Sequence, residues 1–161
     1  MAKKTIHHMD FQTLVQINKE VVALTGEPHG YTPADGEKIE ELLKEVEARA
    51  DNVDFAEAVP DKASLLVFHI ASGQHFKTGN KRTALIAGSV FLRKNGYSIN
   101  LKDEGLVSVV DRVGVAAATL DDLFTAITKL MKKAPVERKG WDKTVTLVVE
   151  SNRKLLTDVA A

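Results

Sequence analysis

The sequence predicts an all-α protein that forms a single domain over residues 1–161. Apolar residues recur mostly at three- and four-residue spacing, and segments rich in Gly, Pro and Asn separate the periodic stretches. The alternation of apolar and polar residues that is typical of a β-strand occurs only in brief stretches. A chain of this length can bury roughly two thirds of the surface that its unfolded form exposes, so it is large enough to have its own core.

Helical periodicity and end signals define the predicted elements in order. The expected helices span residues 10–25, 37–50, 63–72, 80–95, 105–117, 120–133 and 141–160. Asp61 is a suitable N-cap for the third, Asn95-Gly96 ends the fourth, and Thr119 begins the sixth. The third and fourth are apolar nearly all round, so we expect them at the centre of a helical bundle.

Two segments leave the local structure open. Residues 51–60 alternate briefly around Val53, Phe55 and Val59, which fits either an irregular loop or a small β-hairpin acting as a flap. The β-branched run 144–149 weakens the helix prediction for residues 141–160, but their amphipathic pattern favours it.

Composition narrows the class of protein. The 22 basic and 22 acidic residues cancel, which argues against nucleic-acid binding through bulk charge and requires any anion site to be local. The absence of cysteine excludes disulfides and thiol chemistry, and suits a reducing compartment. No apolar leader or membrane span is visible, so we expect a cytoplasmic protein.

A concentration of polar residues at the start of the fourth helix is the best candidate for chemistry. The first turn of a helix presents unpaired N–H groups to an anion, and Gly79 lets the backbone of Gly79-Asn80 approach closely. Arg82 adds a permanently charged guanidinium that can bind phosphate oxygens, and Lys77 and Lys81 add further positive charges to the same turn. The competing interpretation is a helix cap with a solvated basic turn.

The surroundings of this turn favour the functional interpretation. Residues 70–97 resemble the Fic/Doc family, whose pattern is His-x-Phe-x-Asp/Glu-Gly/Ala-Asn-Gly/Lys-Arg. The chain matches it at Phe76, Gly79 and Asn80-Lys81-Arg82, and the lysine is closer to the Doc branch. We call residues 74–82 the signature segment.

The resemblance implies a function. Fic proteins typically transfer AMP, and Doc proteins transfer a phosphate, from a nucleotide to a protein hydroxyl. It therefore implies ATP or another nucleotide with Mg²⁺, a protein target and an antitoxin-like partner. It also implies that Thr78 to Arg82 bind phosphate, with Arg82 stabilising the transferred charge and Phe76 anchoring the loop in the core.

Two residues of the signature segment differ from the family pattern at positions that carry its chemistry. Gln74 replaces the catalytic histidine, and an amide cannot act as a general base. Thr78 replaces the acidic metal ligand, so we assign no metal-binding residue. His75 is the alternative base that the sequence offers, although an exposed loop histidine explains it equally simply.

The C-terminal segment, residues 141–160, is a candidate regulatory helix. Residues 146–151 resemble the Ser/Thr-x-x-x-Glu-Gly/Asn motif of some Fic proteins, whose glutamate pairs with a loop arginine. Glu150 is then the expected inhibitory partner of Arg82, against the plainer interpretation of an exposed helix charge.

Two functional hypotheses follow. In the first, the protein binds a nucleotide or another phosphate ligand but is catalytically impaired or silent. In the second, it is an active transferase, acting as a toxin-like regulator with its base supplied otherwise.

Overall fold

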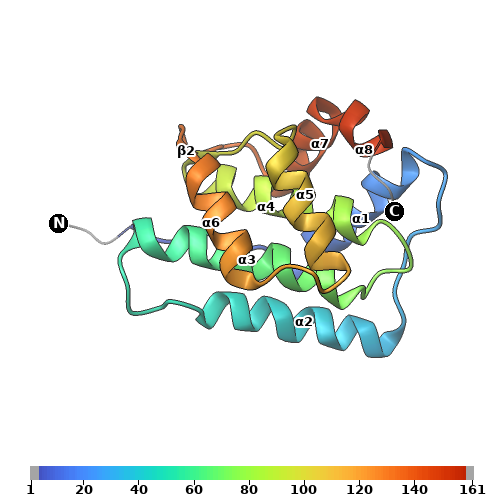
Figure 1. Cartoon of the computed structure of the whole chain (residues 1–161), viewed down its shortest axis with the longest axis horizontal. Coiled ribbons are helices and arrows are strands. Elements are labelled where there is room, and N and C mark those ends of the chain that lie inside the picture. The colour runs from blue at the N-terminus through green and yellow to red at the C-terminus, as the bar shows by residue number, and fades with distance from the viewer. Residues whose placement is uncertain (1–3, 159–161) are drawn as a thin grey trace.

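The computed structural model describes residues 4–158, which form eight helices and two short strands. The elements are α1 (Phe11–Ala23), α2 (Pro33–Ala48), α3 (Phe55–Gly73), α4 (Asn80–Lys94), β1 (Tyr97–Ser98), α5 (Glu104–Gly114), α6 (Leu120–Leu130), β2 (Lys132–Lys133), α7 (Trp141–Ser151) and α8 (Arg153–Asp158). The all-α prediction is confirmed (Figure 1).

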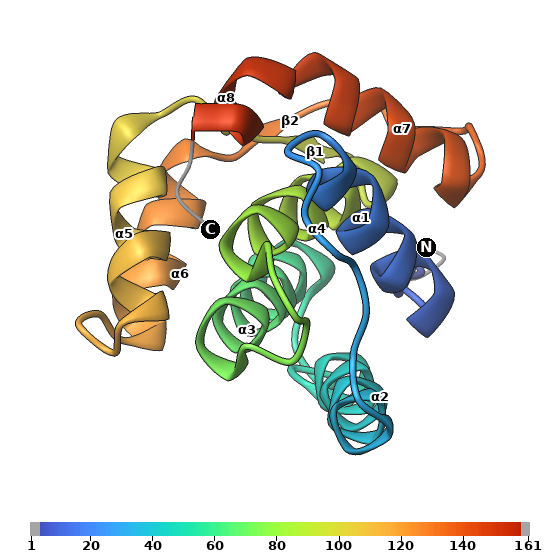
Figure 2. The same ribbon diagram turned by 90° about the vertical axis from the view of Figure 1, so that its right-hand side faces the viewer.

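Helix α4 lies at the centre of the bundle and contacts α3, α1, α7 and α5 (Figure 2). Helix α2 covers α3 from outside, and α6 packs on α3 and α5. The prediction that the third and fourth helices lie at the centre of the bundle is confirmed for α3 and α4. A helix that is apolar on nearly all sides is stable in water only when other helices cover it.

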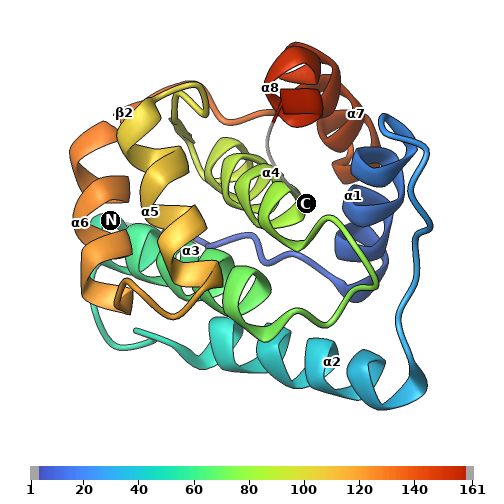
Figure 3. The same ribbon diagram turned by 45° about the vertical axis from the view of Figure 1, so that its right-hand side comes forward.

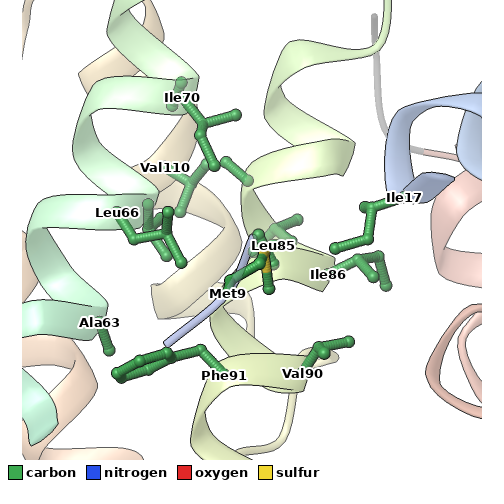
Figure 4. Packing of buried hydrophobic residues seen from close by; sticks show 14 of the residues in the cluster. Met9, Ile17, Ala63, Leu66, Ile70, Leu85, Ile86, Val90, Phe91 and Val110 are labelled. Atoms are coloured by element: carbon green, nitrogen blue, oxygen red, sulfur yellow. The ribbon is translucent and has the colours of Figure 1, made fainter. Parts of the chain in front are cut away.

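The core is continuous from α1 through α4 to α5 (Figure 4). The side chains shown there are fully or nearly fully buried and come from α1, α3, α4, α5 and the N-terminal segment: Ile17, Ala63, Leu66, Ile70, Leu85, Ile86, Val90, Phe91, Val110 and Met9. Burial of this kind stabilises a protein by about 25 cal/mol per Å² of apolar surface. It packs α4 against α1 and α3.

Local capping explains where several helices begin. Asp10 accepts a hydrogen bond from the Thr13 backbone N–H (2.8 Å) at the start of α1. Thr32 does the same for Asp35 before α2, with Pro33 at the first helical position. Helix α2 therefore begins four residues earlier than its apolar pattern indicated.

The hairpin considered for residues 51–60 is not formed, because α3 already begins at Phe55. Asp54, rather than Asp61, is the N-cap, and Asp61 instead pairs with Arg49. Pro60 lies within the helix and is buried together with Val59. Proline removes one N–H near the helix start, and burial of the surrounding apolar face outweighs that loss.

The only sheet in the described residues pairs β1 with β2, antiparallel, with Tyr97 opposite Lys133. The helix expected over residues 120–133 therefore ends earlier, at Leu130. The C-terminal segment is helical as predicted up to Asp158, with an interruption at Asn152 between α7 and α8. The last two positions of the predicted range, 159 and 160, lie outside the described residues. Over residues 4–158, no helix has the length and apolarity needed to cross a bilayer.

Candidate functional site

The loop between α3 and α4 is shaped by two residues in the left-handed conformation. Gln74 ends α3 with φ 51° and ψ 46°, and Gly79 precedes α4 with φ 75°. A left-handed residue is a common way to end a helix, usually with glycine or asparagine in that position. Gln74 thus occupies a backbone position that reverses the chain direction, and its side chain donates from Nε2 to the Gly114 carbonyl (3.3 Å) on α5.

Gly79 is required by space as well as by backbone conformation. A Cβ at this position would lie 2.6 Å from Cγ1 of Val22, which is buried on α1. The loop therefore runs directly against α1, and any larger residue would displace it.

Asn80 holds the loop closed through both ends of its amide. Its Oδ1 accepts from the Phe76 N–H (3.1 Å), and its Nδ2 donates to the Phe76 carbonyl (3.0 Å). Phe76 is buried and meets Tyr31 edge to face, at 6.3 Å between ring centroids. The signature segment is thus anchored in the core at Phe76, which fits the anchoring role that the resemblance implied.

A cleft of about 230 Å³ opens beside this loop. It is lined by Ala71, Gln74, Lys77, Thr78, Gly79, Asn80 and Lys81. Among the described residues, no side chain caps the N-terminus of α4, so the N–H groups of its first turn and the positive end of its dipole remain available for an anion. The structure brings together Gln74 and Thr78 to Lys81, the cleft-facing part of the predicted site.

Arg82 is buried and is not among the residues that line the cleft. Its side chain is 1% exposed; Nη2 lies 2.7 Å from Oε1 of Glu27, and Nη1 donates to Oγ1 of Thr25 (3.0 Å). Both partners lie in the α1–α2 connection, residues 24–32, which passes beside the loop in Figure 3. The resemblance assigned this guanidinium to a phosphate, whereas in the structure it fastens the connection to α4.

Glu27 is ionised readily in this setting. The Thr25 hydroxyl, which donates to Oε1 at 2.6 Å, holds the pKa of the Glu27 carboxyl below its ordinary value, and Arg82 lowers it further. The three side chains form a closed charge-assisted network, since Thr25 both accepts from Arg82 and donates to Glu27.

Thr78 does not offer what Mg²⁺ needs. Its hydroxyl donates to the Pro28 carbonyl (3.1 Å), and its own carbonyl accepts from Nδ2 of Asn18 (2.9 Å). Mg²⁺ in such sites is bound through one or two carboxylates, and this position presents only a neutral, engaged hydroxyl. Within residues 4–158, no group of three His, Asp or Glu side chains is arranged to hold a metal ion.

His75 faces away from the cleft and towards the start of α2. Its Nδ1 lies 3.2 Å from Oδ1 of Asp35, and the same carboxylate accepts from the Thr32 hydroxyl at Oδ2 (2.9 Å). The Thr32 hydroxyl and then His75 lower the pKa of Asp35 below its ordinary value. His75 does not line the cleft, so in this arrangement it ties the loop to α2 and its role as a base stays a prediction.

Glu150 does not form the predicted pair with Arg82. It pairs with Arg153 at 3.2 Å, one turn along the C-terminal segment, and both side chains are exposed. The acidic partner of Arg82 is Glu27, so the contact expected for Glu150 is absent from the structure. Helix α7 packs on α1 and α4, and Thr146 donates to Glu20 of α1 (3.0 Å).

Sequence reasoning missed the polar residues that support the signature segment from α1, α2 and their connection: Asn18, Thr25, Glu27 and Asp35. Asn18 alone carried a visible signal. It lies within the apolar stripe of α1 and is 1% exposed, and a buried amide requires partners. Those partners are the Thr78 carbonyl and Oγ1 of Thr83 (3.1 Å).

Comparison with known proteins agrees with this architecture. No curated protein matches the chain significantly. The profile of the Fic/DOC family matches residues 4–92, more than half of the chain, and spans α1 to α3, the signature segment and most of α4. The helical fold, the buried Phe76 and the Asn80-closed loop at the start of α4 lie within that match, and the chain belongs to the Fic/Doc family.

Proposed function

We propose that the protein binds a phosphate-bearing ligand, such as a nucleotide, in the cleft at the N-terminus of α4, and that it is catalytically silent. The cleft carries the proposal: it is lined by the signature segment, it opens on the uncapped first turn of α4, and it is flanked by Lys77 and Lys81. Backbone N–H groups, a helix dipole and lysines are the groups that hold phosphate in proteins.

Catalytic silence is supported by what lies at the two altered positions. Gln74 lines the cleft where the family has its histidine, and its amide has no basic lone pair at neutral pH. A general base contributes about a hundredfold to ten-thousandfold in rate. Thr78 adds no charge for a metal, so two sources of transition-state stabilisation are missing together.

An active transferase is the second candidate, because one observation favours it. His75 and Asp35 form a hydrogen-bonded pair of the kind that orients a general base, with Thr32 fixing the carboxylate. In that case the loop and the start of α2 would have to move together so that the intact His75–Asp35 pair faces the cleft, and AMP or phosphate would pass to a hydroxyl of a target protein.

A labelling experiment separates the two candidates. The unaltered chain, the Gln74→His, Thr78→Asp double variant and the Thr78→Asp single variant are each incubated with Mg²⁺, a cell lysate and ATP labelled at the α- or the γ-phosphate. We expect label on protein only with the double variant, since it alone restores both base and acid. The single variant is the control for the metal ligand without the base.

Each other outcome has a definite meaning. Label transferred by the unaltered chain would overturn catalytic silence, and loss of that label in His75→Gln would assign the base. Calorimetric titration of the unaltered chain with ATP and with inorganic pyrophosphate tests binding itself. No heat of binding with either anion at millimolar concentration would overturn the proposed phosphate site.

A further inference from the structure

The signature segment carries three cationic side chains, and the structure gives two of them acidic partners. Arg82 is buried and paired with Glu27 at 2.7 Å. Lys81 lies with its Nζ 3.5 Å from Oδ1 of Asp111 on α5. Paired charges contribute less to the potential felt by a ligand, because each acid cancels the field of its partner at a distance.

Lys81 is restricted further by its contact with the end of α5. A Cβ at Gly114 would lie 2.8 Å from Cε of Lys81, so the lysine stem crosses the glycine at close range. Its ammonium is therefore directed along α5 towards Asp111. Lys81 lines the cleft, but its ammonium is paired with the Asp111 carboxylate.

Lys77 is different from both. Its side chain is exposed and lines the cleft, and within residues 4–158 it takes part in no ion pair. Its backbone N–H donates to the Gly30 carbonyl (2.9 Å), and its stem lies beside Gly30, where a Cβ would be 3.7 Å from Cε. The backbone of Lys77 is thus fixed to the α1–α2 connection and the end of its side chain lies beside Gly30, while no carboxylate of residues 4–158 pairs with its ammonium.

We propose that Lys77 is the principal ligand-binding cation of the cleft, and that it binds the terminal phosphate of the ligand. This inference rests on the proposed phosphate site, and it names Lys77 as the residue that supplies the positive charge of that site. The family pattern leaves the position of Lys77 unspecified and assigns the phosphate to Arg82, so the two assignments predict different effects of substitution.

The size of the cleft identifies the part of the ligand that enters it. At about 230 Å³ it lies below the range of roughly 300–1,000 Å³ typical of pockets that enclose a whole small molecule. It accommodates a phosphate or diphosphate group, and the remainder of a nucleotide would lie outside over the rim. Inorganic pyrophosphate should therefore compete with ATP for the same site.

The test is calorimetric titration with inorganic pyrophosphate and with ATP at low ionic strength. The variants are Lys77→Ala, Lys77→Arg, Lys81→Ala and Lys143→Ala, the last being an exposed lysine on α7 that serves as the matched control. We expect Lys77→Ala to weaken binding of both anions at least tenfold, as loss of a charge-assisted hydrogen bond does. Lys77→Arg keeps the charge and should stay within about threefold of the unaltered chain.

The outcomes distinguish this inference from the proposed function. If the unaltered chain binds pyrophosphate and Lys77→Ala binds it equally well, or if Lys81→Ala weakens it more, Lys77 is not the principal cation and the phosphate site stands. If the unaltered chain binds neither anion, both proposals fail. Because Lys77 is exposed, its variants should retain the thermal unfolding midpoint of the parent, which is measured alongside.

Discussion

Oε1 of Glu27 lies 2.7 Å from Nη2 of Arg82, and this ion pair joins the α1–α2 connection to the first turn of α4. Two further contacts reinforce the junction: the Thr78 hydroxyl donates to the Pro28 carbonyl, and the Lys77 N–H donates to the Gly30 carbonyl. The connection thus acts as a strap that fixes the shape of the loop from outside, while Asn80 fixes it from within.

Glu27→Ala should destabilise the protein by about 3 kcal/mol, because it leaves the Arg82 guanidinium buried without a counter-charge. Urea unfolding followed by circular dichroism measures the change. Glu150→Ala is the matched control: it breaks an exposed pair with Arg153 and should change the free energy of unfolding by about 1 kcal/mol at most. Equal effects of the two substitutions would show that the Arg82 pair is not buried in solution.

The Glu27 carboxyl should also make stability depend on pH. Its pKa in the folded protein lies below the ordinary value of 4.5, so its contribution is complete above that pH and is lost as the pH falls through the lowered pKa. The difference in unfolding free energy between the unaltered chain and Glu27→Gln should be constant above about pH 5.5 and shrink below 4.5. A gap that instead widens on acidification would contradict the assignment.

Gly79→Ala should destabilise the protein by at least about 2 kcal/mol, through two separable effects. A positive φ of 75° is unfavourable for alanine by about 1–2 kcal/mol, and its Cβ would collide with Val22 at 2.6 Å. Adding Val22→Ala should relieve the collision and leave the backbone effect. The double variant should therefore be less destabilised than the sum of the single variants, and simple additivity would sink this account.

Asn80→Ala should destabilise the protein by about 1–2 kcal/mol and weaken anion binding, because it removes both hydrogen bonds to the Phe76 backbone. Unfolding and pyrophosphate titration test the two effects separately. Asn152→Ala is the control: it removes one side-chain hydrogen bond, from Nδ2 of Asn152 to the Val148 carbonyl, and Asn152 does not line the cleft. It should lower stability modestly and leave pyrophosphate affinity unchanged; a similar loss of affinity in both would mean that Asn80 acts only through global stability.

Local patterns in the sequence were sufficient to predict the helical fold and the position of the candidate site. The apolar repeats placed α1, α3 and α4, and the match at Phe76, Gly79 and Asn80 identified the loop between the central helices. These features depend on residues that are close along the chain, since a helix cap or an apolar stripe is defined within a few turns. The same reasoning began α3 too late, because the brief alternation around Val53, Phe55 and Val59 and a suitable cap at Asp61 concealed a helix that already begins at Phe55.

Tertiary structure decided how the charges of the site are used. Glu27 and Arg82 are 55 residues apart, Asn18 and Thr78 are 60 apart, and Asp35 and His75 are 40 apart. No periodicity links residues at such separations; the packing of α1 on α4 and of α2 on α3 brings them within hydrogen-bond distance. The sequence alone therefore determined which residues form the loop, whereas packing determined that Arg82 is buried in an ion pair and that Lys77, which lines the cleft, has no ion-pair partner within residues 4–158.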